Sequence, residues 1–133
     1  MIPPFNNNGY LPPGIHHATL EEVQERFGHG SEQRETLSQS LDWLVPLCRQ
    51  AGITKILLNG SFVTARPEPN DIDCVLFQGP EFKDDHPATL ELQEGLPFMD
   101  IQMVDEADYN LFSEVIFVSD RNFRPKGIVE VLL

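Results

Sequence analysis

The sequence has few basic residues. Only nine of its 133 residues are lysine or arginine, against 21 aspartates and glutamates, so the formal net charge is −12. A surface this acidic repels the backbone of nucleic acids and anionic membranes unless cations intervene. The composition therefore argues against a protein that binds duplex DNA. It leaves open a small polyanion that is bound together with a metal ion.

Cysteines and long apolar runs are also scarce. The two cysteines, Cys48 and Cys74, each lie in an apolar run with no partner at metal-ligand spacing, so we expect buried free thiols. No apolar run approaches the roughly 18–20 residues that span a bilayer. The N-terminus lacks a basic region followed by an apolar one, so no signal peptide is indicated. These features predict a cytoplasmic protein that does not contact membranes.

The length and composition predict one folded domain behind a short arm. A chain of 133 residues with 41% hydrophobic residues has room for a single core. Residues 1–15 carry four prolines, two glycines and three asparagines, which predicts an extended N-terminal arm. Residues 16–133 are expected to form the domain.

Two helices are expected in the first half of the domain. Thr19 and Glu22 form a capping box before a short helix, and Gly28 should end it in a left-handed conformation. A longer helix over residues 32–50 should begin after Ser31, with Pro46 kinking or shortening it. Its expected buried stripe consists of Leu37, Leu41, Leu44, Val45 and Cys48.

The second half of the chain has the pattern of strands. Residues 54–60, 71–77 and 97–104 read as strands, and residues 127–133 alternate well enough for a terminal strand. A short helix is expected near Leu90, and residues 106–118 fit a helix or a strand equally. These elements predict an α/β or α+β fold, a small mixed β-sheet with flanking helices.

Three aspartates interrupt these strands. Asp71 and Asp73 should lie on the same face of one strand, roughly 7 Å apart. Asp100 interrupts an apolar strand that we expect to pair beside theirs. Like charges so close together are costly unless a cation lies between them, and Mg²⁺ prefers oxygen ligands. The alternative is that Asp71 caps a turn and Asp73 is a solvated edge residue.

A Gly-Ser pair follows the first of these strands. If the strand ends at Asn59 and a helix begins near Ser61, its free N–H groups would favour a phosphate, which Gly60 would allow to approach. Together the aspartates and Gly60-Ser61 predict a site for a nucleoside triphosphate with up to two Mg²⁺ ions.

This pattern resembles a known family. The chain resembles the nucleotidyltransferase superfamily that includes DNA polymerase β. The shared pattern is an apolar strand, Gly-Ser, about ten residues, Asp-x-Asp on a strand, and a third Asp on a later strand. The chain looks most like its minimal bacterial members, of the kind found in toxin–antitoxin and phage-defence pairs. The stretches "GYLPPGIHHATLEEVQERFG", "LNGSFVT" and "RPKGIVEVLL" also resemble a group of small uncharacterised bacterial proteins.

The resemblance implies metal-dependent transfer of a nucleoside monophosphate from a nucleoside triphosphate to a hydroxyl on a protein or RNA, within a nucleotidyltransferase-like fold. It implies that Asp71 and Asp73 bind both metal ions, that Asp100 helps to activate the acceptor, and that Gly60 and Ser61 bind phosphate. The chain departs from the family pattern at three positions: Phe62, Ala65 and Asn70.

Basic residues near the predicted site are further candidates for phosphate contacts. Arg66 lies between Ser61 and Asp71, and Lys126 lies in the stretch "DRNFRPKG" with Arg121 and Arg124. The simpler interpretation of that stretch is a solvated turn. The alternative function is a catalytically inactive protein of the same fold that neutralises a partner. Because so short a chain has little room to grip an acceptor, a cognate partner protein or a homo-oligomer is expected.

Overall fold

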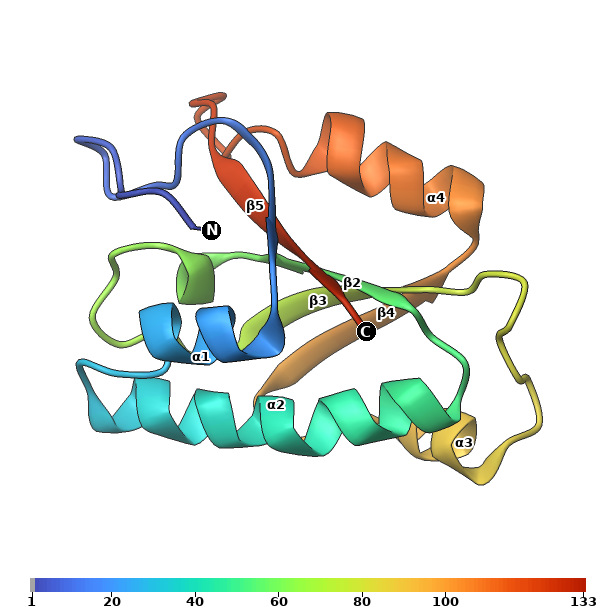
Figure 1. The fold of residues 1–133 in the computed structure, drawn as a ribbon. Helices are drawn as coiled ribbons and strands as arrows, with labels where there is room; N and C mark the ends of the chain where they lie inside the picture. The colour runs from blue at the N-terminus through green and yellow to red at the C-terminus, as the bar shows by residue number, and fades with distance from the viewer. Residues whose placement is uncertain (1) are drawn as a thin grey trace.

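A mixed five-stranded sheet forms the centre of the protein. The structure is a computed structural model that describes residues 2–133. The strands are β1 (Gly14–Ala18), β2 (Lys55–Asn59), β3 (Ile72–Phe77), β4 (Met99–Val104) and β5 (Gly127–Leu132). Their order across the sheet is β1-β5-β2-β3-β4 (Figure 1). β1 runs parallel to β5 and β3 parallel to β4, whereas β2 is antiparallel to both of its neighbours.

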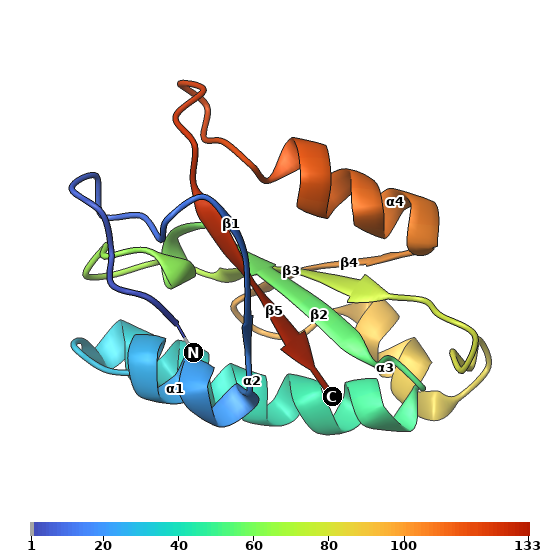
Figure 2. The ribbon, with the colours of Figure 1, turned by 45° about the horizontal axis from the view of Figure 1, so that its top comes forward.

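Helices cover both faces of the sheet. They are α1 (Leu20–Phe27), α2 (Glu32–Gln50), α3 (Pro87–Glu94) and α4 (Glu106–Leu111), and α4 continues into a π-helical turn, Phe112–Ile116. The first three lie on one face and α4 lies on the other (Figures 1 and 2). The predicted α+β fold with a mixed sheet and flanking helices is confirmed, and the ambiguous stretch after Val104 is a helix.

The strand alternation gives each face of the sheet its own core. Ile72, Cys74 and Leu76 of β3 pack into the large core beneath α1, α2 and α3. Val75 and Phe77 point to the other face and pack with Tyr109 of α4, because successive side chains of a strand alternate between faces. Cys48 and Cys74 are buried and free, as expected.

The helix starts follow the sequence, and one detail of the helices, the left-handed conformation of Gly28, was predicted wrongly. Thr19 and Glu22 form both hydrogen bonds of the capping box, and Ser31 caps α2. Gly28 ends α1 with φ of −87°, so it is not left-handed; close packing against Ser38 leaves no space for a side chain there. Pro46 lies within a helix that continues to Gln50, so it does not shorten α2.

The N-terminal segment is part of the packed domain. Residues 2–13 form no helix or strand, as expected for an extended arm, yet Leu11 is fully buried and its carbonyl accepts a hydrogen bond from the N–H of Gly127. β1 begins at Gly14, inside the expected arm, and forms one edge of the sheet beside β5. Its sequence, GIHHA, is short and half polar, so it gives little strand signal.

Within residues 2–133, no helix is long and apolar enough to cross a membrane.

Candidate functional site

Two of the three aspartates lie side by side in the sheet. Asp73 of β3 is paired in register with Asp100 of β4 on one side and with Asn59 of β2 on the other. Residues paired in this way present their side chains on the same face. Asp71 comes directly before β3. The predicted pairing of the Asp100 strand beside the Asp71-Asp73 strand is therefore confirmed.

The carboxylates of Asp73 and Asp100 lie on the α4 face of the sheet, at the end where β3 begins. Ile72 and Cys74 point into the large core, so Asp73 between them points to the opposite face. α4 covers that face around Phe77, at the far end of β3. Asp73 is half-buried, whereas Asp71 and Asp100 are exposed. A ligand can thus reach this acidic group from solvent.

Asp73 is held in an unfavourable electrostatic environment. Partial burial, and then the negative charges of Asp71 and Asp100, raise the pKa of its carboxyl, while Lys126 lowers it. These contributions show that both other aspartates are close enough to repel Asp73. A cation bound between them would remove this repulsion.

Lys126 is a basic residue whose charge acts on Asp73. Its ammonium donates a hydrogen bond to Oδ1 of Asn59, at 2.8 Å. Burial lowers the pKa of Lys126, and the nearby carboxylates of Asp73 and Asp120 oppose that effect. The Lys126 side chain thus lies between the acidic group and the end of β2.

Gly60 allows this turn to lie against Asp73. Its backbone has φ of 77° and ψ of −164°, a combination that essentially only glycine adopts. A Cβ atom at this position would collide with Oδ2 of Asp73. The glycine is thus needed both for the backbone conformation and for the space that the carboxylate occupies.

The helix expected at Ser61 is a single 3-10 turn, Ser61–Val63. A helix thus begins at Ser61 as expected, but it is only one turn long, and phosphate binding there stays a prediction. Thr64 ends the turn by directing its hydroxyl and its N–H to the carbonyl of Ser61. The Ser61 hydroxyl and the backbone of the turn are the groups left to contact a phosphate.

Arg34, which the sequence analysis missed, holds this turn in place. Its guanidinium is buried and donates hydrogen bonds to five backbone carbonyls, of Phe27, Ser61, Phe62, Thr64 and Arg66. The start of α2 fixes the following loop as well, through bonds from Ser31 to the Pro67 carbonyl and from Gln33 to the Asn70 carbonyl. A lone arginine in an amphipathic helix looks like a surface residue, so nothing in the sequence indicated this role.

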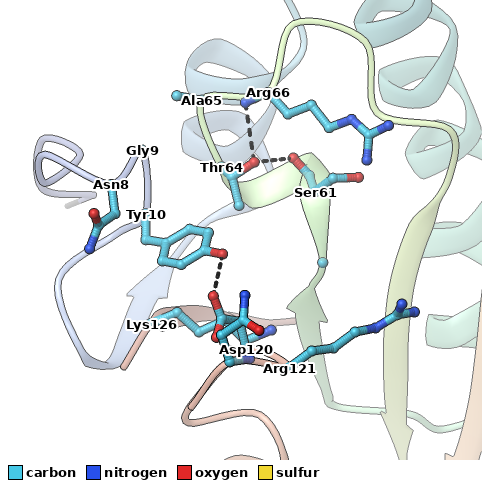
Figure 3. Close-up of a pocket in the computed structure, with 12 residues that line it drawn as sticks. Asn8, Gly9, Tyr10, Ser61, Thr64, Ala65, Arg66, Asp120, Arg121 and Lys126 are labelled. Atoms are coloured by element: carbon cyan, nitrogen blue, oxygen red, sulfur yellow. Dashed lines mark hydrogen bonds between the residues drawn. The ribbon is translucent and has the colours of Figure 1, made fainter. Parts of the chain in front are cut away.

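An open cleft of about 660 Å³ adjoins the turn (Figure 3). Three segments surround it: the arm at residues 8–10, residues 60–66, and the loop at residues 120–126. Its lining includes four predicted residues, namely Gly60, Ser61, Arg66 and Lys126. Asp71, Asp73 and Asp100 are not part of this lining, but Asp73 touches Gly60 at its edge.

No group of three Asp, Glu, His or Cys side chains among residues 2–133 is arranged to hold a metal ion by itself. The donor chemistry nevertheless fits Mg²⁺, which usually takes only one or two protein carboxylates and completes its shell with water and substrate phosphates. Asp73 and Asp100, in register on neighbouring strands, supply two such carboxylates, and Asp71 a third.

We expect Gly60→Ala to disturb the acidic group, and Gly95 offers a matched control. Both glycines have the same rare backbone conformation, but a Cβ at Gly95 would meet no atom within 4 Å. Each substitution should lower the free energy of unfolding by about 1–3 kcal/mol. Only Gly60→Ala should also weaken Mg²⁺ binding, measured by calorimetric titration, because only there must Asp73 move. Equal Mg²⁺ affinity in the two variants would contradict this.

Comparison with known proteins identifies a family but no function. No curated protein and no solved structure matches the chain. One family model matches residues 3–132, which includes the arm, the turn after β2 and all three aspartates. The chain therefore belongs to the DUF6932 family, a family of unknown function.

Proposed function

We propose that the protein is a metal-dependent nucleotidyltransferase that moves a nucleoside monophosphate from a nucleoside triphosphate to a hydroxyl on a protein or RNA. The observation that supports it best is the register of Asp73 with Asp100, directly beside the glycine turn and the cleft. A group of carboxylates next to a cleft that is lined in part by basic side chains is the arrangement that this chemistry needs.

The residues divide into two groups by their roles. Asp71, Asp73 and Asp100 would hold Mg²⁺, which when bound neutralises phosphate charge and polarises the reacting oxygens. The Ser61 hydroxyl donates a hydrogen bond to the leaving phosphates, and Lys126 attracts them by its charge. Arg66 and Arg121 extend this positive wall of the cleft.

The reaction is an in-line displacement at the α-phosphorus. The acceptor oxygen forms a bond to phosphorus as the bond to the pyrophosphate oxygen breaks, and the leaving group departs as pyrophosphate. Asp100, the exposed carboxylate of the pair, accepts the proton of the acceptor hydroxyl and passes it to water. Binding of a cation would relieve the repulsion that Asp71 and Asp100 exert on Asp73.

The first test is a transfer assay. The purified protein is mixed with Mg²⁺ and each α-labelled nucleoside triphosphate, together with a lysate as the source of acceptors. We expect label on a protein or RNA, released pyrophosphate, and loss of both signals with Asp71→Ala or with chelator. Asp85→Ala, which removes an exposed carboxylate on the loop before α3, should leave the transfer unchanged.

The same experiment addresses the alternative of an inactive binding protein. If the protein binds no nucleoside triphosphate in a metal-dependent way, the enzyme proposal fails. A partner that co-purifies with the Asp71→Ala variant as well as with the unchanged protein would then support a neutralising role.

A further inference from the structure

The N-terminal arm forms one wall of the cleft. Asn8, Gly9 and Tyr10 are among its lining residues. The arm is attached at two points, because the N–H of Ala65 donates to the carbonyl of Gly9 at 2.9 Å and the N–H of Gly127 donates to the carbonyl of Leu11 at 3.0 Å. This wall is therefore fixed in the folded protein, before any ligand arrives.

Tyr10 joins the arm to the loop on the other side of the cleft. Its hydroxyl donates a hydrogen bond to Oδ2 of Asp120, at 2.7 Å, as Figure 3 shows. Oδ1 of Asp120 accepts bonds from the N–H groups of Asn122 and Arg124, so the same carboxylate fixes the turn that carries Arg121. The arm and the basic loop are thus held in one arrangement by Asp120.

The two ends of the cleft differ in charge. The arm contributes only uncharged groups, and the carboxylate of Asp120 lies beside them. The cationic side chains come from the other two segments: Arg66, Arg121 and Lys126. In Figure 3, the guanidinium groups of Arg66 and Arg121 extend away from Asn8 and Tyr10. Arg66 and Arg121 therefore attract a phosphate away from the arm, whereas the charges of Asp120 and Lys126 offset each other beside Tyr10.

We infer that the arm binds the nucleoside part of the triphosphate, an inference that rests on the proposed function. The Tyr10 ring offers an aromatic surface to a base or ribose, and the exposed Asn8 amide can both donate and accept hydrogen bonds. The volume of about 660 Å³ lies within the roughly 300–1,000 Å³ of pockets for small molecules. Asn8 is the specificity residue, and Tyr10 is a positioning residue that keeps the wall closed.

The experiment compares ligands with and without a nucleoside. The probes are inorganic tripolyphosphate and the α,β-methylene analogues of the four ribonucleoside triphosphates, each titrated calorimetrically with Mg²⁺. Asn8→Ala and Tyr10→Phe should each lower the affinity for the tightest-binding analogue by about fivefold, which is the effect of losing one hydrogen bond. Neither should change the affinity for tripolyphosphate, which makes no nucleoside contact.

Tyr109→Phe is the matched control. Tyr109 also donates a hydrogen bond to a carboxylate, Oε2 of Glu130 at 2.8 Å, but it lies in the core under α4, outside the cleft lining. This variant should bind the analogues as the unchanged protein does.

Other results of these titrations would contradict the inference, the proposed function or both. The nucleoside assignment to the arm is overturned if Asn8→Ala and Tyr10→Phe lower the affinity for tripolyphosphate as much as the affinity for the analogue. It is also overturned if they lower neither affinity. In both cases the proposed function stands. If the unchanged protein binds tripolyphosphate but no analogue better, the nucleoside site itself is refuted. If it binds none of the probes, the proposed function and this inference both fail.

Discussion

The Asp73→Asn variant should lose nucleotidyl transfer and gain stability at the same time. Transfer should fall about a thousandfold, the upper range for removing one group that stabilises transition-state charge, because Asp73 is close to both of the other carboxylates. The raised pKa of Asp73 means that its ionised form is disfavoured in the folded protein. Such a group contributes stability below the ordinary carboxyl pKa and loses that contribution as the pH rises through the folded-state value.

At neutral pH, ionised Asp73 therefore destabilises the metal-free protein. Asparagine removes the charge and keeps the shape, so scanning calorimetry in chelator should show a free energy of unfolding about 1 kcal/mol higher for the variant. The gain should shrink as the pH falls toward the ordinary range of aspartate. Mg²⁺ should raise the melting temperature of the unchanged protein but not that of the variant.

Asp84→Asn is the control for this experiment, because Asp84 is an exposed carboxylate on the loop before α3. It removes the same charge from the acidic chain without touching the site, so transfer and the Mg²⁺ effect should remain. Equal stabilisation by the two variants would assign the effect to net charge rather than to the aspartate group. An active Asp73→Asn variant would refute the proposed role.

The acidic group was predictable because it depends on strand periodicity. Charged residues inside apolar strands are rare unless they have a partner, and this drew attention to Asp73 and Asp100. The strand that carries Asp100 was expected to pair beside the strand that carries Asp73. β4 does pair with β3, and Asp100 is in register with Asp73. Local sequence thus determined which residues share a face of the sheet.

The cleft was less predictable because it depends on contacts between distant segments. Its arm wall is about 110 residues from the loop that Tyr10 contacts, and the arm sequence indicates only that no regular structure forms. The conformation of the turn at Ser61 is set by Arg34, which lies 27–32 residues earlier. Hydrogen bonds from one side chain to several backbone carbonyls leave no periodic pattern in a sequence.

The second large effect is expected for Arg34→Met, which should destabilise the whole domain. Methionine fills the space of the arginine stem but cannot donate to the five carbonyls that the guanidinium contacts. Each buried acceptor that remains unpaired costs about 1–3 kcal/mol, and those near the surface recover a bond to water. We therefore expect a loss of about 3 kcal/mol in the free energy of unfolding, measured by urea denaturation. The melting temperature should fall by about 10 °C.

Two further arginine variants separate the hydrogen bonds of the Arg34 guanidinium from the effects of its charge and its packing. Arg34→Lys keeps the positive charge, but an ammonium cannot reach all of these carbonyls, so the loss should be intermediate. Arg26→Met removes an arginine whose guanidinium lies over the Phe5 ring and makes one long hydrogen bond to Ile2, so it should cost under about 1 kcal/mol. In folded Arg34→Lys, tripolyphosphate binding should weaken, because the turn at Ser61 loses part of its support. If Arg34→Met were no less stable than Arg26→Met, the turn would be held by its own backbone, and Arg34 would have no part in shaping the cleft.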